Sequence, residues 1–141
     1  MFHKILAPTD LSEPSFQALQ QAMLLAKDND AELTLLRVLS NGEVANGELD
    51  TEKRHLDDMV RDYAPDDLAM ITLVRQGDVT GEILRAAQDG KFDLIVMATH
   101  GTTGWREFVL GSITGEVVRL APCPVLTIGS KATSGHSNGI H

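Results

Sequence analysis

Two kinds of segment alternate along this chain, and their order limits the folds that it can adopt. Short runs rich in leucine and β-branched residues are separated by longer stretches in which apolar residues recur at helical spacing. The short runs show little alternation of apolar with polar residues, which is typical of strands covered on both faces of a parallel sheet. The five runs are Ile5 to Ala7, Glu32 to Leu39, Leu68 to Arg75, Asp93 to Ala98 and Pro124 to Ile128.

Four helices are predicted between these strands, because each intervening stretch carries residues that start or stop helices. Ser12 and Pro14 begin the first, Pro65 ends the second, Asp78 and Gly90 bound the third, and Ser112 or Thr114 opens the fourth, which ends before Pro122. Strict alternation of strand and helix predicts an α/β fold: one doubly wound, Rossmann-like domain whose parallel sheet has helices on both faces. The pattern alone leaves two strand orders open, 3-2-1-4-5 and 2-1-3-4-5.

Charge and composition exclude several classes of partner. The formal net charge is -8 and the 12 Lys and Arg residues form no cluster, so we expect no binding to nucleic acid. Cys123 is the single cysteine, which excludes an internal disulfide and suits a reducing compartment. No apolar run approaches the length of a membrane span and the first residues do not resemble a secretory signal, so we expect a cytoplasmic protein.

We expect one domain over residues 1–130, followed by a flexible polar tail over residues 131–141. The stretch from Asn41 to Gly47 reads as a second flexible segment, a loop between the second strand and the second helix.

The loop after the fourth strand carries glycines at a spacing that suits a phosphate site. Gly101 follows the strand, and Gly111, Ser112, Ile113 and Thr114 open the next helix after nine intervening residues. Glycines let backbone amides approach an anion closely, and a helix N-terminus favours negative charge. The hydroxyls of Ser112 and Thr114 could add donors. The alternative is a plain turn and helix cap, and no P-loop lysine occurs in the chain.

Asp10 follows the first strand in the sequence Pro8-Thr9-Asp10. If strands 1 and 4 are neighbours, this carboxylate faces the glycine loop across the crevice where open α/β sheets bind ligands. It could accept from ribose hydroxyls or hold Mg²⁺, or it could simply cap the first helix. His100 fits a hydrogen-bonding role in the loop better than a general base, because no nucleophile can be tied to it. Roles for Trp105 and Arg106, in the spacer, stay open.

Three blocks of sequence together resemble the universal stress protein family: Ile5 to Pro14, Val96 to Ser112 and Ala121 to Ile128. The similarity covers the chain to about Gly129. Members of that family that bind ATP have a first glycine where this chain has Ala98. An alanine is compatible with the site if its φ is negative and is strained if φ is positive.

The resemblance implies the strand order 3-2-1-4-5 and a site for ATP, or for AMP or ADP, and the carboxylate of Asp10 is the candidate ligand for an accompanying Mg²⁺. By position, Pro8, Thr9 and Asp10 would line the adenosine side and Val38 would meet the adenine edge through its backbone. Met97 and Ala98 would lie under the sugar. The phosphates would be held by Gly101, Gly111, Ser112, Ile113 and Thr114. The resemblance also implies a homodimer through strand 5, Pro124 to Ile128.

Three functions therefore compete. The first is an ATP-binding regulatory protein of the stress response, with no catalytic residue. The second is a nucleotide-independent, dimeric interaction module of the same fold. The third is a slow ATP hydrolase, against which stands the lack of a P-loop lysine and of an evident base.

Overall fold

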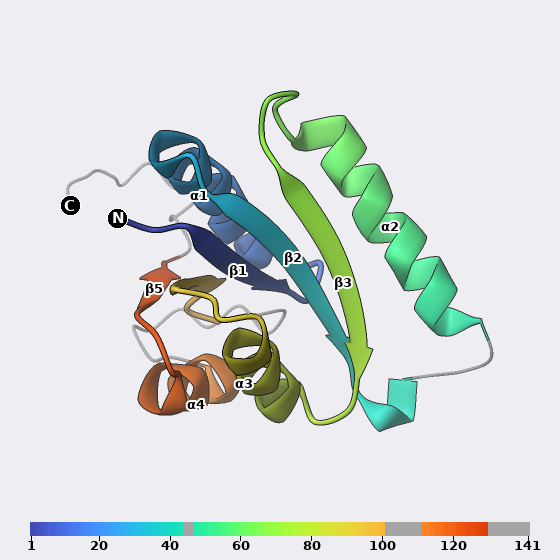
Figure 1. The fold of residues 1–141 in the computed structure, drawn as a ribbon. Coiled ribbons are helices and arrows are strands. Elements are labelled where there is room, and N and C mark those ends of the chain that lie inside the picture. Colours follow the sequence, from blue (N-terminus) through green and yellow to red (C-terminus); the bar gives the residue numbers. More distant parts are fainter. Residues whose placement is uncertain (44–46, 101–110, 130–141) are drawn as a thin grey trace, which may run out of the picture.

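The structure, a computed structural model, describes residues 1–43, 47–100 and 111–129. Its centre is a parallel five-stranded sheet of order β3-β2-β1-β4-β5, which confirms the predicted α/β fold and the order 3-2-1-4-5 (Figure 1). β1 pairs with β2 on one side and with β4 on the other. The strands are β1 (Lys4–Thr9), β2 (Glu32–Leu39), β3 (Met70–Gln76), β4 (Leu94–Ala98) and β5 (Val125–Ile128).

The four predicted helices are present: α1 (Glu13–Asn29), α2 (Glu48–Tyr63), α3 (Val79–Asp89) and α4 (Ser112–Leu120). The predicted caps are confirmed where a side chain closes the first turn. The Ser12 hydroxyl accepts from the amide of Ser15 at 3.3 Å, and the Asp78 carboxylate accepts from the amide of Gly81 at 2.8 Å. Of the two starts predicted for the last helix, Ser112 is the one observed, with Gly111 as the cap.

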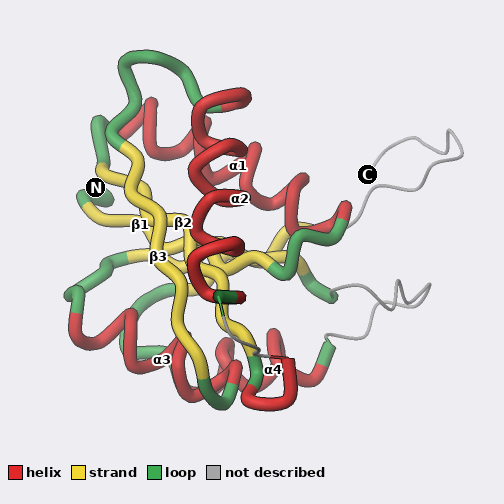
Figure 2. Tube along the Cα trace, turned by 90° about the vertical axis from the view of Figure 1, so that its right-hand side faces the viewer, coloured by secondary structure: helices red, strands yellow, loops and turns green. Residues whose placement is uncertain are grey.

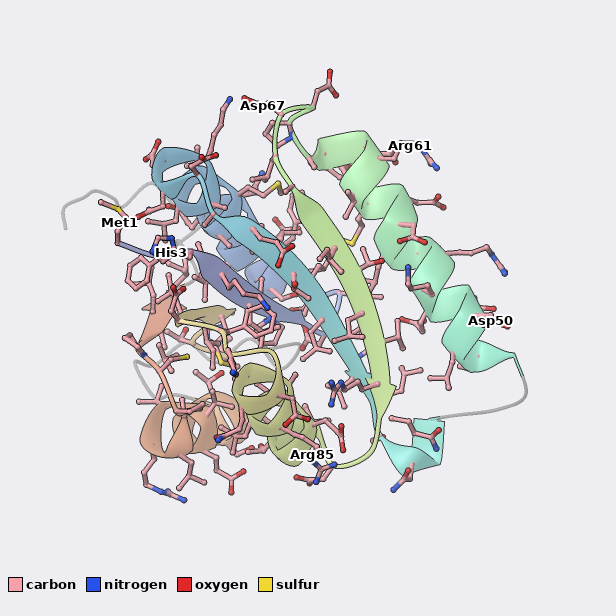
Figure 3. The ribbon with its side chains drawn as sticks, in the orientation of Figure 1. Met1, His3, Asp50, Arg61, Asp67 and Arg85 are labelled. Atoms are coloured by element: carbon pink, nitrogen blue, oxygen red, sulfur yellow. The ribbon has the colours of Figure 1, made fainter. Side chains whose placement is uncertain are left out.

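Helices cover both faces of the sheet in two pairs, as Figures 1 and 2 show: α1 with α2, and α3 with α4. Alternate residues of β1 separate the two cores. Ile5 and Ala7 pack with α1 and α2, whereas Leu6 packs with α3 and α4. The outer face of α2 is charged, and Figure 3 shows Asp50 and Arg61 pointing from it into solvent. No helix in the ranges given above is long and apolar enough to cross a bilayer.

The predicted strands differ from the observed ones by at most two residues at their ends, and two segments differ in their local structure. Leu68 precedes β3 instead of opening it, because its amide donates to the carbonyl of Pro65 in a turn, at 3.1 Å. Part of the loop predicted as flexible from Asn41 to Gly47 is a short 3-10 helix, Asn41–Glu43. The predicted tail, residues 131–141, lies outside the described residues, as do Gly101, Trp105 and Arg106.

Candidate functional site

A pocket of about 250 Å³ lies where β1, β2 and β4 end, on the side of the sheet covered by α3 and α4. This is the switch point of the 3-2-1-4-5 order, where the connections from β1 and β4 leave the sheet in opposite directions. The pocket gathers most of the residues predicted for a nucleotide: Pro8, Thr9, Asp10, Val38, Met97, Ala98, Ile113 and Thr114. Gly111 and Ser112 adjoin it without lining it.

The turn after β1 is fixed by hydroxyl groups. Thr9 Oγ1 lies 2.9 Å from the hydroxyl of Ser15 and accepts from the amide of Leu11 at 3.0 Å. Leu11 has a φ of 65°, a left-handed conformation that this turn requires. Asp10 does not cap α1, since Ser12 does; Asp10 Oδ1 instead accepts from the amide of Ser12 at 3.0 Å. The carboxylate is therefore held at the pocket by its own turn.

The end of β4 is joined directly to the start of α4. Thr114, which is 4% exposed, donates its hydroxyl to the carbonyl of Ala98 at 2.8 Å. The amide of Gly111 donates to the carbonyl of Thr99, also at 2.8 Å. The single hydroxyl proton of Thr114 is thus bonded to backbone in this structure, so donating it to a phosphate would require this bond to break.

Ala98 itself has a conformation that alanine adopts freely. Of the described non-glycine residues, three have positive φ, and they are Leu11, Asp30 and Lys91. Ala98 is the last residue of β4 and is 6% exposed. The φ of Ala98 is therefore negative, which is the condition under which an alanine in place of the family glycine is compatible with the site.

The first turn of α4 presents backbone donors at the pocket. The helix begins at Ser112, and its first internal bond runs from the amide of Gly115 to the carbonyl of Gly111 at 2.8 Å. The amides of Ser112, Ile113 and Thr114 precede that bond, and no side chain of the described ranges caps them. Three N–H groups at the positive end of a helix dipole form an environment that favours an anion.

His100 lies beside this helix start and is 8% exposed. Its Nδ1 is 3.0 Å from Thr99 Oγ1, which agrees with the hydrogen-bonding role expected for it in the loop. A Cβ on Gly111 would stand 3.4 Å from the Cα of His100, so α4 begins in close contact with the histidine backbone.

Arg37 is the lining residue that sequence reasoning missed most clearly. Its side chain is 15% exposed, and its Nε donates to Glu52 Oε1 of α2 at 3.2 Å. Its Nη1 donates to the carbonyl of Val38 at 3.3 Å, the backbone group expected to meet an adenine edge. A lone arginine near the end of a largely apolar strand was the available signal. The other lining residues that were not predicted are Ser15, Leu36, Val79, Ile83 and His100.

The carboxylates do not assemble into a metal site of their own. Across the described ranges, no three His, Cys, Asp or Glu side chains converge as metal ligands. A larger hollow, of about 510 Å³, lies between the start of α1 and α2 and is lined by Phe16, His55 and Tyr63 among others. It shares no lining residue with the pocket at the strand ends, where open α/β sheets bind ligands.

With this geometry established, comparison with known proteins identifies the family. Residues 1–129 match the model of the universal stress protein family, so the chain belongs to that family. The universal stress protein YxiE of Bacillus subtilis is 29% identical over 147 residues, covering 91% of this chain and 99% of YxiE.

Two solved structures extend the comparison. The structure of MJ0577 of Methanocaldococcus jannaschii is 28% identical, with a TM-score of 0.82 over 94% of this chain and 99% of that one. A family protein from Arabidopsis thaliana, solved with AMP bound, shares the fold at 16% identity, with a TM-score of 0.64 over 96% of this chain and 97% of that one.

Proposed function

We propose that this protein binds ATP as a regulator of the stress response, with the nucleotide between the β1 turn and the start of α4. The observation that carries the proposal is the pocket at the switch point, where the predicted residues of β1, β2, β4 and α4 converge. Family membership agrees with it, and a more distant protein of the same fold has been solved with AMP.

The two ends of the pocket differ in chemistry. Val38 and Met97, with Leu36 and Ile83, give an apolar slot on the side of β2 and α3, which suits a purine base. The carbonyl of Val38 keeps a second lone pair besides the one that Arg37 uses, so it can accept from an exocyclic amine. The amides of Ser112 to Thr114 give the opposite end, where phosphates would bind. Gly101 would add its amide there, by the family pattern.

Asp10 fits a ribose hydroxyl or a Mg²⁺ ion. One of its oxygens accepts from Ser12, and the other has no partner among the described residues. Mg²⁺ characteristically takes one or two carboxylates and completes its shell with phosphate oxygens and water. A single carboxylate therefore fits Mg²⁺ only together with the phosphates. The metal would neutralise charge that a chain of net charge -8 otherwise repels.

The test is thermal unfolding of nucleotide-free protein with and without Mg·ATP. At 100 times Kd the ligand adds about 2.7 kcal/mol, which raises the melting temperature of a domain of this size by several degrees. No shift at millimolar Mg·ATP would contradict the proposal. Mass spectrometry of small molecules released from freshly purified protein gives a second, unbiased measurement.

Gly111 provides a matched pair of variants. A Cβ at this position would lie 3.4 to 3.6 Å from its neighbours, ordinary contact distances, so Gly111→Ala should fold and bind as the wild type does. Gly111→Val adds two methyl groups against His100 and the helix start, so we expect it to lose the shift with Mg·ATP. The melting temperature of each variant without ligand separates lost binding from lost folding.

We also propose a homodimer through β5. This strand is an edge of the sheet, its outer side pairs with no described strand, and Leu126 is 39% exposed. Edges of this kind are commonly paired, and antiparallel pairing of two β5 strands would give a two-fold contact. Light scattering at tens of micromolar that gave only the 15.3 kDa mass would refute the dimer. A dimer without any nucleotide effect would favour the interaction module instead.

A further inference from the structure

His100 has one ring nitrogen that its surroundings do not use. The residue is 8% exposed and lines the pocket. Nδ1 pairs with Thr99 Oγ1 at 3.0 Å, whereas Nε2 has no hydrogen-bond partner in residues 1–43, 47–100 and 111–129. Gln17 Oε1 is the one fully buried side-chain nitrogen or oxygen of the described residues that lacks a partner, so the unpaired Nε2 of His100 keeps contact with solvent. At the wall of the pocket it is therefore open to a ligand.

The position of His100 indicates which part of a ligand it would meet. The amide of Gly111 is bonded to the carbonyl of Thr99, and the Gly111 backbone packs on that of His100. The imidazole and the free amides at the start of α4 therefore border the same end of the pocket. Arg37 is the one lysine or arginine among the described residues that line the pocket, and it is paired with Glu52 near the opposite end. An anion at the helix start thus has His100 as its neighbouring side-chain donor in the described pocket.

We propose that His100 binds the phosphate of the nucleotide through Nε2 and so makes the site prefer nucleoside phosphates over nucleosides. This inference rests on the proposed function. When the Thr99 hydroxyl donates to Nδ1, the proton of the neutral ring is on Nε2, the atom that faces the ligand. Thr99 is then a positioning residue, which fixes both the tautomer and the angle of the ring.

The experiment is calorimetric titration of AMP and of adenosine into the wild type, His100→Asn and His100→Gln. The side-chain amide of asparagine reaches the place of Nδ1 and keeps a bond to Thr99, but has nothing at Nε2. The longer side chain of glutamine puts its amide nitrogen near Nε2. A hydrogen bond to a charged group supports an effect of about ten- to a hundredfold. We expect His100→Asn to weaken AMP by that factor with adenosine unchanged, and His100→Gln to recover most of the loss.

Equal losses for adenosine and AMP, or no loss for AMP, would overturn the role of His100 while leaving the nucleotide site intact. A wild type that binds neither ligand and shows no thermal shift with Mg·ATP would overturn the proposed function itself, so the two failures can be told apart. If the wild type binds Mg·ATP alone, the same variants are compared with Mg·ATP, and an unchanged affinity in His100→Asn overturns the role of His100. If His100→Asn fails to fold, ¹⁵N spectra of the histidine rings in the wild type decide. The Nε2 resonance of His100 should move with AMP and stay in place with adenosine. The reverse, or no movement with AMP, contradicts the proposal.

Discussion

Replacing Thr114 with valine tests whether its hydroxyl serves the fold or a ligand. The two side chains have nearly the same shape, so Thr114→Val removes the hydroxyl without opening a cavity. In the structure that hydroxyl donates to the carbonyl of Ala98 at 2.8 Å, and Thr114 as a whole is 4% exposed. Valine therefore leaves a buried carbonyl without its donor.

The cost follows from that lost partner. An unsatisfied buried carbonyl destabilises the native state by about 1 to 3 kcal/mol. For a domain of this size each kcal/mol corresponds to roughly 3 to 4 °C, so the melting temperature should fall by about 3 to 12 °C. Thermal and urea unfolding followed by circular dichroism measure both quantities. Thr114→Ser, which keeps the hydroxyl and loses one methyl group, should retain most of the stability.

The affinity for nucleotide gives the second half of the test. Because the hydroxyl proton is bonded to Ala98, we expect Thr114→Val to lower the stability of the protein and to change its affinity for Mg·ATP little. A valine variant as stable as the wild type, yet unable to bind Mg·ATP, would show that the hydroxyl acts on the ligand. That result would refute the assignment of this bond as structural.

Three more predictions follow from particular contacts. Asp78→Ala removes the bond to the amide of Gly81 and should cost about 1 kcal/mol in chemical unfolding, whereas Asp78→Asn, also a good cap, should cost less. The hydrogen bond from Thr72 holds the pKa of Asp57 below its usual value of about 3.9, so its contribution to stability is present above that pH and disappears as the pH falls through the lowered pKa. Because Asp57 is about half exposed, we expect Asp57→Asn to lower the free energy of unfolding only slightly at pH 7. At pH 2 the wild type and Asp57→Asn should have the same free energy of unfolding. Steady-state ATP hydrolysis should stay below about 1 s⁻¹, because amides that bind ground-state phosphates give affinity without selective stabilisation of the transition state; a faster rate that Gly111→Val abolished would make the protein an enzyme.

The strand order was predicted from the family resemblance, since the pattern of elements alone left two orders open, and two loops agreed with it. Asp10 after the first strand and the glycines after the fourth can share a ligand only if those strands are neighbours, and β1 does pair with β4. The helix caps were equally accessible, since Ser12 and Asp78 act on amides three residues away and depend on local sequence alone.

The hydrogen bonds that shape the pocket could not be predicted in the same way. Thr114 bonds to Ala98, sixteen residues earlier, and which acceptor it finds depends on how α4 packs against the end of β4. Arg37 pairs with Glu52 across a helix–sheet contact, and Glu52 is one of many acidic residues in the sequence of α2. Sequence spacing indicates which residues share an element, but the choice between several equivalent partners is made by tertiary packing.

The position of β1 in the middle of the sheet affects how the chain can fold while it is being synthesised. β1, β2 and β3 emerge from the ribosome in that order, and β2 is the partner of both others, but the second partner of β1 begins only at Leu94. At about 5 to 20 residues per second, β1 remains a temporary open edge for on the order of several seconds. Thr9 and Asp10 are made at the beginning of that interval, and Thr114 is made after it. A nucleotide that needs both sides of the pocket therefore cannot guide the nascent chain; it can only stabilise a chain whose translation is almost finished.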